Sequence, residues 1–247
     1  MFMGDVLIDR RRLPNQTVFI YLTAGDDGRD STYWQTRERA ALASTRLAAG
    51  GLDSAGLNCG PVTIATHPIW RCLGSDAASY FLRLPDGRRN GRGFATHEFE
   101  SLWRLHRARI AHISAIDGSS SYSGWRDLTN TISAIVADSG PRVHVHANDP
   151  SVVINPHDHT DHRVAGLLAE QLRRDRHWLA SYYVGYALAT RADNLSTKQR
   201  QVKTSLFLLY EREMTRVHGE WSAYREHPKF YTQCMARTYH RAPQVRR

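Results

Sequence analysis

The sequence predicts an α/β protein with a mostly parallel sheet that is covered by helices on both faces. Two observations carry this prediction. Runs of β-branched and aromatic residues recur along the chain, and segments with apolar residues at helical spacing lie between them. Strands that alternate with helices in this way favour parallel pairing. The chain of 247 residues contains no repeat and no convincing linker, so one domain over residues 1–247 is expected.

The first half of the chain supplies three of the predicted strands and two of the helices. The β-branched and aromatic run at 17–22 is typical of a parallel strand that is buried on both faces. It ends in a Gly-Asp-Asp-Gly turn and leads into a helical pattern that the pair Gly50–Gly51 stops. A Pro-Asp-Gly turn closes the third strand. The spacing of apolar residues places the second and third strands at 61–67 and 79–84. It places the two helices at 33–50 and 98–114.

The second half continues this alternation. The segment 125–140 has helical spacing, and the run 142–150 alternates apolar and polar residues before it enters a turn. An amphipathic helix at 162–175 is followed by an aromatic-rich run at 178–188 that predicts another strand. A long closing helix begins at residue 197, so the region 201–247 is expected to be a C-terminal helix and a basic tail.

The formal net charge of +9 raises nucleic acid as a partner, but the basic residues are spread along the chain and form no recognised nucleic-acid motif. No nucleic-acid partner is therefore expected. No apolar run approaches the roughly 20 residues of a membrane span, and no signal peptide is visible. Three cysteines without Cys-x-x-Cys spacing indicate neither a disulfide framework nor a thiolate zinc site, so a cytoplasmic location is expected. The sequence predicts no particular oligomeric state.

The segment INPHDHTDHRVAG, at 154–166, holds the densest group of potential metal ligands in the chain. His159 and His162 are three residues apart at the predicted first turn of a helix, so both side chains can project to one side. Imidazole nitrogens are good zinc ligands, and neighbouring carboxylates can fix the ring tautomer. The same residues also fit a polar loop in which Thr160 or Asp161 caps the helix. The residues alone leave both interpretations open.

Three loops leave the carboxyl ends of predicted strands and should meet at one edge of the sheet: 23–30, 83–87 and 147–162. Ligands bind at this edge in open α/β sheets. We therefore expect His159 and His162 to lie side by side near the loops that contain Asp26 and Arg83.

Several segments resemble the PIG-L (LmbE-like) zinc deacetylases in content, order and spacing. They are VFIYLTAGDDGRDSTYWQTRERAALAS, YFLRLPDGRRNGRGF and DHTDHRVAG, with further similarity at SLWRLHRARI and YYVGYALATRADNLS. The similarity covers most of the chain, to about residue 200. It implies a Rossmann-like three-layer fold. It also implies zinc-dependent removal of the N-acetyl group from an N-acetylglucosamine-type sugar or sugar conjugate.

The resemblance also implies roles for particular residues. His162 corresponds to a metal ligand of the family, and His159 to the residue that stabilises or protonates the tetrahedral transition state. Asp161 is the neighbour of His159 in the catalytic motif. Arg83 falls where the family places a sugar-contacting arginine. Asp26 and Asp149, on the neighbouring loops, are further candidates for substrate binding.

One part of the family pattern is missing. The family binds its metal partly through a His and an Asp from an early His-x-Asp-Asp motif, and residues 1–16 contain no such motif. The segment 1–8 instead resembles the helix that follows the motif. The sequence therefore predicts a domain that is truncated at its amino terminus, with weak zinc binding and no measurable deacetylation of N-acetylglucosamine conjugates. The alternative is a relative without catalysis that still binds carbohydrate through Arg83 and the loop near Asp149.

Overall fold

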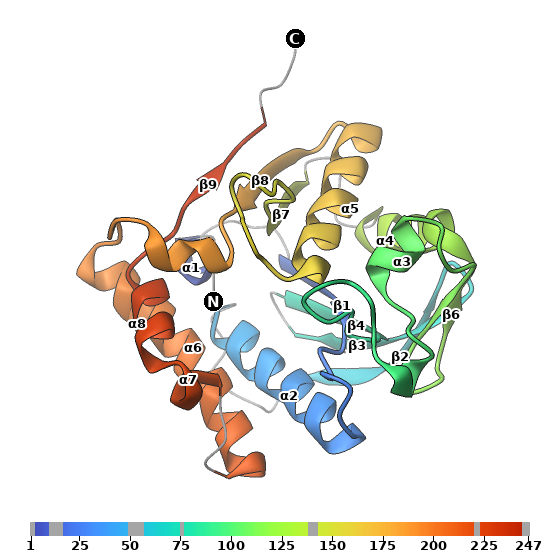
Figure 1. Ribbon diagram of the computed structural model, residues 1–247, viewed down its shortest axis with the longest axis horizontal. Coiled ribbons are helices and arrows are strands. Elements are labelled where there is room, and N and C mark those ends of the chain that lie inside the picture. The colour runs from blue at the N-terminus through green and yellow to red at the C-terminus, as the bar shows by residue number, and fades with distance from the viewer. Residues whose placement is uncertain are drawn as a thin grey trace.

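Helices cover both faces of the strands at the centre of the molecule (Figure 1). The structure is a computed structural model and describes residues 3–9, 17–48, 57–74, 77–137, 143–219 and 223–243. Its strands are β1 (Thr17–Thr23), β2 (Asn58–Ile64), β3 (His67–Leu73), β4 (Ala77–Leu84), β5 (Ile113–Ser114), β6 (Ser121–Tyr122), β7 (His144–Asn148), β8 (Leu179–Tyr183) and β9 (His240–Arg241). Its α-helices are α1 (Gly4–Asp9), α2 (Ser31–Ala48), α3 (Leu102–His106), α4 (Gly124–Ala137), α5 (Thr160–Arg176), α6 (Thr197–His218), α7 (Ala223–Glu226) and α8 (Pro228–Met235), and the 3-10 helices are η2 (Ala95–His97) and η3 (Tyr186–Thr190). The predicted α/β class is confirmed.

The described strands form two main sheets. In the first, the order is β1-β4-β3-β2, with β1 parallel to β4 and the other two pairs antiparallel. In the second, the order is β7-β8-β9, with β7 parallel to β8 and β9 antiparallel to β8. β5 and β6 form a separate small hairpin. Both main sheets therefore mix parallel and antiparallel pairs. The prediction of a mostly parallel sheet is not confirmed by the described strands.

The antiparallel pair of β2 and β3 is a hairpin that the sequence did not predict. Ala65 and Thr66 connect β2 to β3, and both have positive φ angles, of 47° and 75°. A two-residue turn with two positive φ angles matches the twist of antiparallel strands, but Asn and Gly are its usual residues. Because Ala and Thr give no such signal, the run 61–67 was predicted as one strand. It contains the end of β2, the turn and the start of β3.

A disulfide bond joins the two strands of this hairpin. Cys59 and Cys72 are register partners, and their Cα atoms are 4.1 Å apart. The expectation of no disulfide is therefore wrong, because strand register rather than sequence spacing brings these cysteines together. Disulfides are typical of oxidising compartments, so this bond does not support the predicted cytoplasmic location. Cys234 is buried and free.

The segment predicted as a helix at 98–114 is largely not helical. Glu98 and Phe99 have positive φ angles, of 52° and 58°, which helical residues do not adopt. Ser101 then caps α3 by accepting a hydrogen bond from the Arg104 N–H at 3.2 Å. The helix ends at His106, and the chain continues to β5. The other four predicted helices are present as α2, α4, α5 and α6, and the strand predicted at 178–188 is confined to β8.

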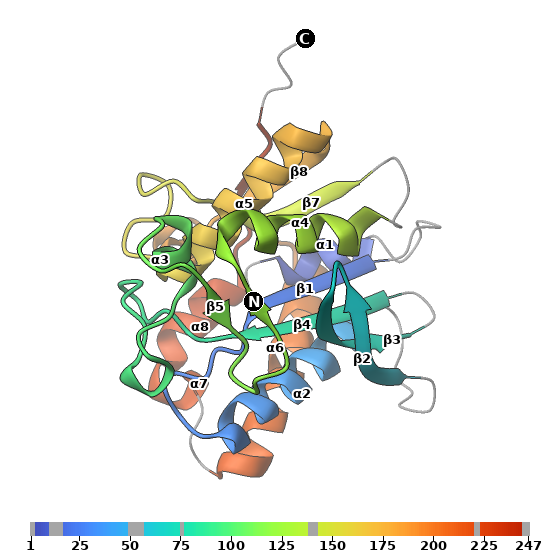
Figure 2. The ribbon, with the colours of Figure 1, turned by 90° about the vertical axis from the view of Figure 1, so that its right-hand side faces the viewer.

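The helices form two layers on either side of the strands. α2 and α6 pack together on one face, and α3, α4 and α5 lie on the other (Figure 2). The largest buried apolar cluster joins the first sheet to α3, α4 and α5, and includes Ile69, Leu82, Leu84, Leu102, Leu105, Leu128, Ile132, Val164 and Leu168. This packing brings the amino terminus of α5 to the loops that follow β1 and β4. No helix in the described segments is long and apolar enough to cross a membrane.

Candidate functional site

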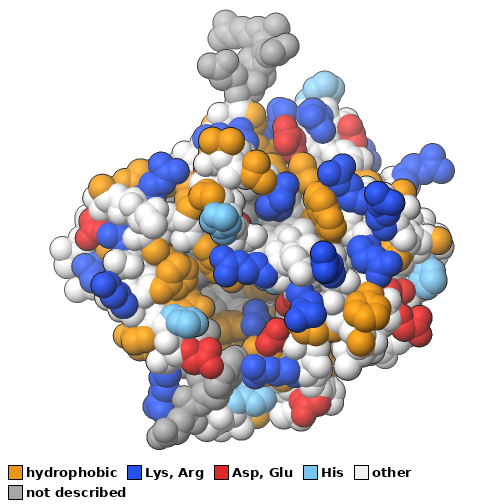
Figure 3. All heavy atoms as spheres, viewed as in Figure 1, with side chains coloured by type: hydrophobic (Ala, Val, Ile, Leu, Met, Phe, Trp, Pro, Cys, Tyr) orange, Lys and Arg blue, Asp and Glu red, His pale blue; other side chains and the backbone are white. Residues whose placement is uncertain are grey.

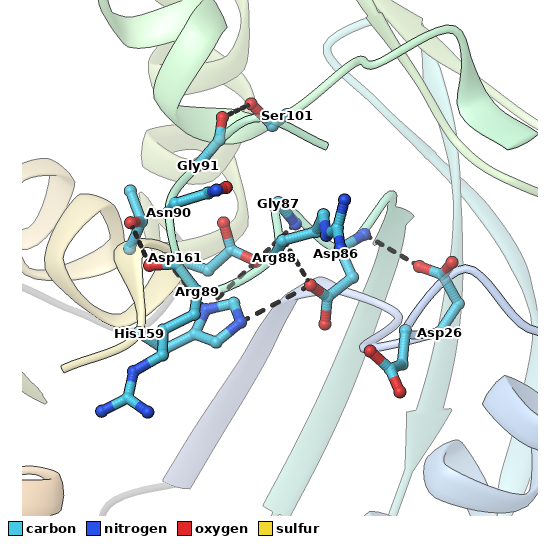
Figure 4. Close-up of polar contacts among 12 residues, drawn as sticks. Asp26, Asp86, Gly87, Arg88, Arg89, Asn90, Gly91, Ser101, His159 and Asp161 are labelled. Atoms are coloured by element: carbon cyan, nitrogen blue, oxygen red, sulfur yellow. Dashed lines mark hydrogen bonds and ion pairs between the residues drawn. The ribbon is translucent and has the colours of Figure 1, made fainter. Parts of the chain in front are cut away.

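Three side chains gather at the amino terminus of α5. Asp86, His159 and Asp161 each offer one potential ligand atom, and these atoms lie within 4.8 Å of one another. His159 Nε2 is 3.5 Å from Asp86 Oδ1, and His159 Nδ1 is 3.7 Å from Asp161 Oδ2 (Figure 4). One imidazole ring therefore has a carboxylate on each side. Such a group can hold a proton or a divalent cation.

The Pro-Asp-Gly turn after β4 is held in place by two buried aspartates. The Asp86 N–H donates to Asp26 Oδ1 at 2.8 Å, and the Gly87 N–H donates to Asp161 Oδ2 at 2.9 Å. A Cβ atom at residue 87 would lie 2.4 Å from Asp161 Oδ1, so any side chain at this position would displace the Asp161 carboxylate. The backbone of the turn thereby sets the position of Asp161 relative to Asp86.

The first turn of α5 fixes the orientation of the His159 ring. His159 is the N-cap residue, and its Nδ1 accepts a hydrogen bond from the Asp161 N–H at 3.3 Å. The sequence had suggested Thr160 or Asp161 as the cap. Thr160 instead begins the helix, and its hydroxyl donates to the Arg89 carbonyl at 2.7 Å. Because Nδ1 accepts, the proton of the neutral ring is assigned to Nε2, which faces Asp86.

The charges around His159 favour its protonated form. Burial lowers the pKa of His159, but the hydrogen bond to Asp86 and the charge of Asp161 outweigh burial and raise this pKa above its ordinary value. For Asp86, burial is the largest single effect and raises the pKa, but the hydrogen bond and charge of His159, the Arg88 N–H and the charge of Arg37 together outweigh it and lower the pKa. His159 therefore holds a proton more readily near neutral pH than an exposed histidine does.

Asp161 is buried and only partly hydrogen bonded. Its Oδ1 has no hydrogen-bond partner among the described residues. Burial raises the pKa of Asp161 to about 7, although the charge of His159 acts in the opposite direction. A buried carboxylate oxygen without a partner costs free energy. This oxygen is therefore the point at which the cluster would accept a proton or a cation.

His162 lies in the first turn of α5 and is supported by Asp158. Its Nδ1 is 2.9 Å from Oδ1 of Asp158, whose side chain is 0% exposed. The ring centroids of His159 and His162 are 5.5 Å apart, so the two histidines lie side by side. A carboxylate behind an imidazole is typical of metal-ligating histidines, because it fixes the tautomer and raises the basicity of the ring. Among the described residues, however, no group of three potential ligands includes His162.

Arg83 is enclosed by acidic and aromatic side chains. Its Nε and Nη2 donate to the Glu38 carboxylate at 2.8 Å each, and its Nη1 donates to Asp117 at 2.7 Å. Its guanidinium also lies 5.1 and 5.0 Å from the ring centroids of Trp34 and Trp70. The side chain that was predicted to contact a sugar is therefore already engaged within the fold.

The other two predicted substrate-binding residues also make internal contacts. Asp26 is buried, and its Oδ2 is 2.9 Å from Nε2 of His97, while its Oδ1 holds the Pro-Asp-Gly turn. Asp149 is buried and forms an ion pair with Arg241 of β9, at 2.5 Å from Nε. Asp26 thus positions one wall of the candidate site, whereas Asp149 links the end of β7 to β9.

The structure brings three of the predicted site residues together: His159, Asp161 and His162. Asp26 joins them through Asp86, whereas Arg83 and Asp149 form their ion pairs with other parts of the chain. Sequence reasoning missed Asp86 because Pro-Asp-Gly was interpreted only as a turn. It expected neighbouring carboxylates to fix the histidine tautomers but did not single out Asp158 as the one that pairs with His162. The signal for Asp86 was its place in a loop that was expected to converge on the site.

Comparisons of the chain with models of protein families, with curated proteins and with solved structures found no match. The resemblance to the PIG-L deacetylases thus rests on the sequence segments quoted above.

Proposed function

We propose that this chain is a zinc-dependent hydrolase of the PIG-L type, with a Rossmann-like fold, that removes the N-acetyl group from an N-acetylglucosamine-type sugar or sugar conjugate. One observation carries the proposal: the imidazole of His159 lies between the carboxylates of Asp86 and Asp161, beside His162. Amide hydrolysis needs a group that protonates the leaving nitrogen, and a histidine with a raised pKa meets that need.

His159 is the proton donor in this proposal. Its Nε2 faces Asp86, and the two flanking carboxylates keep the imidazolium form available near neutral pH. The ring can pass a proton to the leaving amide nitrogen, and its positive charge stabilises the negative charge that develops on the carbonyl oxygen. In the neutral ring the Asp161 N–H donates to His159 Nδ1. In the imidazolium form Nδ1 carries a proton, and the nearest carboxylate oxygen to it is Asp161 Oδ2, at 3.7 Å.

Zinc is the cofactor that the resemblance implies, and the described residues fit it in part. His162, with Asp158 behind its ring, has the surroundings of a ligating histidine. A set of three donors is offered only by Asp86, His159 and Asp161 among the described residues. A zinc ion supplies Lewis acidity, which polarises an amide carbonyl and lowers the pKa of water. We assign zinc binding to His162 and proton donation to His159. The other arrangement, in which Asp86, His159 and Asp161 bind the cation, is distinguished by the variants described below.

Basic side chains surround the approach to the cluster. Figure 3 shows a hollow near the centre of its face, where Figure 1 places the amino terminus of α5, and Lys and Arg side chains border it. Arg88, Arg89 and Arg92 follow Asp86 in the chain and are exposed. Clefts lined by one sign of charge attract ligands of the opposite sign. The positive surroundings therefore favour sugar conjugates that carry an anionic group.

A non-catalytic carbohydrate-binding protein is the alternative that the sequence suggested. That function was expected to use Arg83 and the loop near Asp149. Both side chains are paired with charged residues inside the fold. The structure thus offers no particular observation that favours this alternative over the hydrolase.

Release of acetate from N-acetylglucosamine conjugates by the full chain, with excess zinc, tests the proposed function. The missing early motif predicts no measurable deacetylation, but we expect the cluster at the start of α5 to support slow, zinc-dependent release. This release should fall about 100-fold or more in His159→Ala, because a positioned acid contributes about 10²–10⁴-fold. His162→Ala should lose zinc affinity, measured by calorimetry. His112→Ala is the matched control, because this imidazole is 60% exposed and pairs with Glu100 outside the cluster.

Two results would contradict these assignments. An absence of acetate release at saturating zinc, or equal rates in all variants, would refute the hydrolase. Zinc binding that survives His162→Ala but is lost in Asp86→Asn and His159→Ala would place the cation at the three-donor group instead.

A further inference from the structure

A serine, a histidine and an aspartate form a hydrogen-bonded row outside the cluster at the start of α5. His67, the first residue of β3, has its Nδ1 3.1 Å from Ser120 Oγ and its Nε2 3.0 Å from Asp127 Oδ1. Ser120 comes directly before β6, and Asp127 lies in the first turn of α4. The row shares no residue with the proposed zinc site and is therefore a second place where chemistry can occur.

The hairpin of β5 and β6 directs Ser120 toward His67. Successive side chains of a strand point to opposite faces, so Ser120 and Tyr122 lie on the same face. The His67 ring stacks on the Tyr122 ring with 4.4 Å between the centroids, and Tyr122 is fully buried. Ser121 points to the other face, where its hydroxyl lies 3.2 Å from that of Ser114. The register of the hairpin thus fixes the Ser120 hydroxyl against the imidazole.

The positions of the protons in this row follow from Asp127. An ionised carboxylate can only accept hydrogen bonds, and Asp127 also accepts one from the Ser123 N–H at 2.8 Å. The neutral His67 ring therefore donates from Nε2 to Asp127, which assigns the lone pair to Nδ1. The Ser120 hydroxyl donates to this lone pair. Its oxygen is then adjacent to a general base, as an activated nucleophile requires.

The three side chains have the roles of a serine–histidine–aspartate triad. The usual triad places Nε2 toward the serine, whereas Nδ1 faces Ser120. Proton transfer depends on which ring nitrogen holds the lone pair, and either nitrogen can do so. The reversed ring therefore changes the orientation of the base and leaves its chemistry unchanged.

A backbone N–H next to Ser120 is placed to stabilise an oxyanion. The Ala115 N–H donates to the Ser120 carbonyl at 2.8 Å, so these two residues form a hydrogen-bonded pair of the hairpin. Ser121 is opposite Ser114 in the next pair, and the N–H groups of such a pair point away from the partner strand. The Ser121 N–H therefore points away from β5. Donors of this kind bind the negative oxygen of a tetrahedral intermediate.

We propose that Ser120, His67 and Asp127 form a second, metal-independent hydrolytic site that acts on short-chain acyl esters. Gly118, Ser119 and Ser121 are exposed, so an ester can reach Ser120 from solvent. These neighbours are small and offer no apolar surface to a long acyl chain. The substrate class is therefore a small ester with a short acyl group.

The reaction takes place in two steps. Ser120 Oγ forms a bond to the carbonyl carbon of the ester, and its proton passes to His67 Nδ1. The bond to the alcohol then breaks, and the alcohol leaves with that proton, so an acyl group remains on Ser120. In the second step a water molecule attacks the acyl carbon and gives a proton to Nδ1. Ser120 Oγ leaves with this proton, and a carboxylic acid is released.

A fluorophosphonate probe tests the nucleophile on the full chain in the presence of a metal chelator. This probe bonds covalently to activated serines, and peptide mass spectrometry locates the labelled residue. We expect label on Ser120, lost in Ser120→Ala and unchanged in Ser119→Ala. Ser119 is the matched control, because its hydroxyl donates directly to Asp117 Oδ1, at 2.6 Å, without an imidazole. Equal labelling of the two serines, or no label on Ser120, would overturn the proposal.

Asp127→Asn tests the role of the imidazole. The Ser123 N–H keeps the amide oxygen of Asn as its acceptor, so the amide NH₂ faces His67 Nε2 and the ring proton moves to Nδ1. Nitrophenol release from p-nitrophenyl acetate should then fall at least about 100-fold, because the wrong tautomer removes the base. The same fall is expected in Ser120→Ala, and none in Ser119→Ala.

Two further results decide the proposal. His67→Gln, which also removes the base, replaces Asp127→Asn if that variant does not fold. Equal rates in the original chain and the folded variants, or faster acylation of Ser120 by p-nitrophenyl dodecanoate than by the acetate, would refute the proposed site. The chelator removes any zinc-dependent reaction, so failure of this test leaves the proposed deacetylase unaffected.

Discussion

Replacing Asp161 with Asn is expected to stabilise the metal-free protein above pH 7. The pKa of Asp161 is raised from an ordinary 3.8 to about 7 by burial, so the folded state keeps a proton that the unfolded state releases. The stabilising contribution of this proton is complete below the unfolded pKa and is lost as the pH rises through the folded pKa. A shift of about three pKa units corresponds to roughly 4 kcal/mol. The Asn side chain carries no charge and avoids this loss.

Urea unfolding at pH 4 and pH 8 measures the effect. The free energy of unfolding of the original chain should fall by roughly 4 kcal/mol more than that of Asp161→Asn between these pH values. Asp175→Asn, an exposed position on the same helix, is the control and should follow the original chain. Parallel pH dependences of the original chain and Asp161→Asn would show that the carboxyl group is not held neutral by the fold.

Replacing Arg83 with Met is expected to cost about 3 kcal/mol of stability while leaving the KM for an N-acetylated sugar unchanged. Removing one partner of a buried ion pair typically costs about 3–5 kcal/mol, and the side chains of Arg83, Glu38 and Asp117 are 15%, 17% and 18% exposed, which reduces the effect. The substitution leaves both carboxylates without their cation. It also removes the guanidinium from the rings of Trp34 and Trp70.

Thermal unfolding and steady-state kinetics separate a structural role of Arg83 from substrate binding. Adding Glu38→Gln and Asp117→Asn to Arg83→Met should recover most of the lost stability, because no unpaired charge remains. A tenfold rise in KM in Arg83→Met, with unchanged stability, would instead support the sugar contact that the family resemblance implies.

The sequence predicted those helices and strands whose signal lies within one short segment. The β-branched run at 17–22 and the apolar spacing at 162–175 correspond to β1 and α5. The hairpin at Ala65 and Thr66 was missed because its turn lacks the usual residues. The Cys59–Cys72 bond was missed because it depends on this hairpin.

In the candidate site, too, the residues with a local signal were predicted, and those brought in by tertiary packing were not. His159 and His162 were found because they stand close together in one short segment. Asp86 was not found, because only the packing of α5 against the turn after β4 brings it to His159. The partners of Arg83 were equally hidden, since Glu38 is 45 residues away in the sequence and Asp117 is 34 residues away. Long-range charge pairing has no local signature in the sequence.

Anomalous X-ray scattering at the zinc edge, from crystals of the full chain soaked with zinc, tests the central assignment most directly. We expect one peak at the amino terminus of α5, about 2.1 Å from the ring nitrogen of His162 that faces away from Asp158, with His159 still hydrogen bonded at its N-cap position. A peak that is coordinated by Asp86, His159 and Asp161 without His162, or no peak at this end of α5, would contradict it.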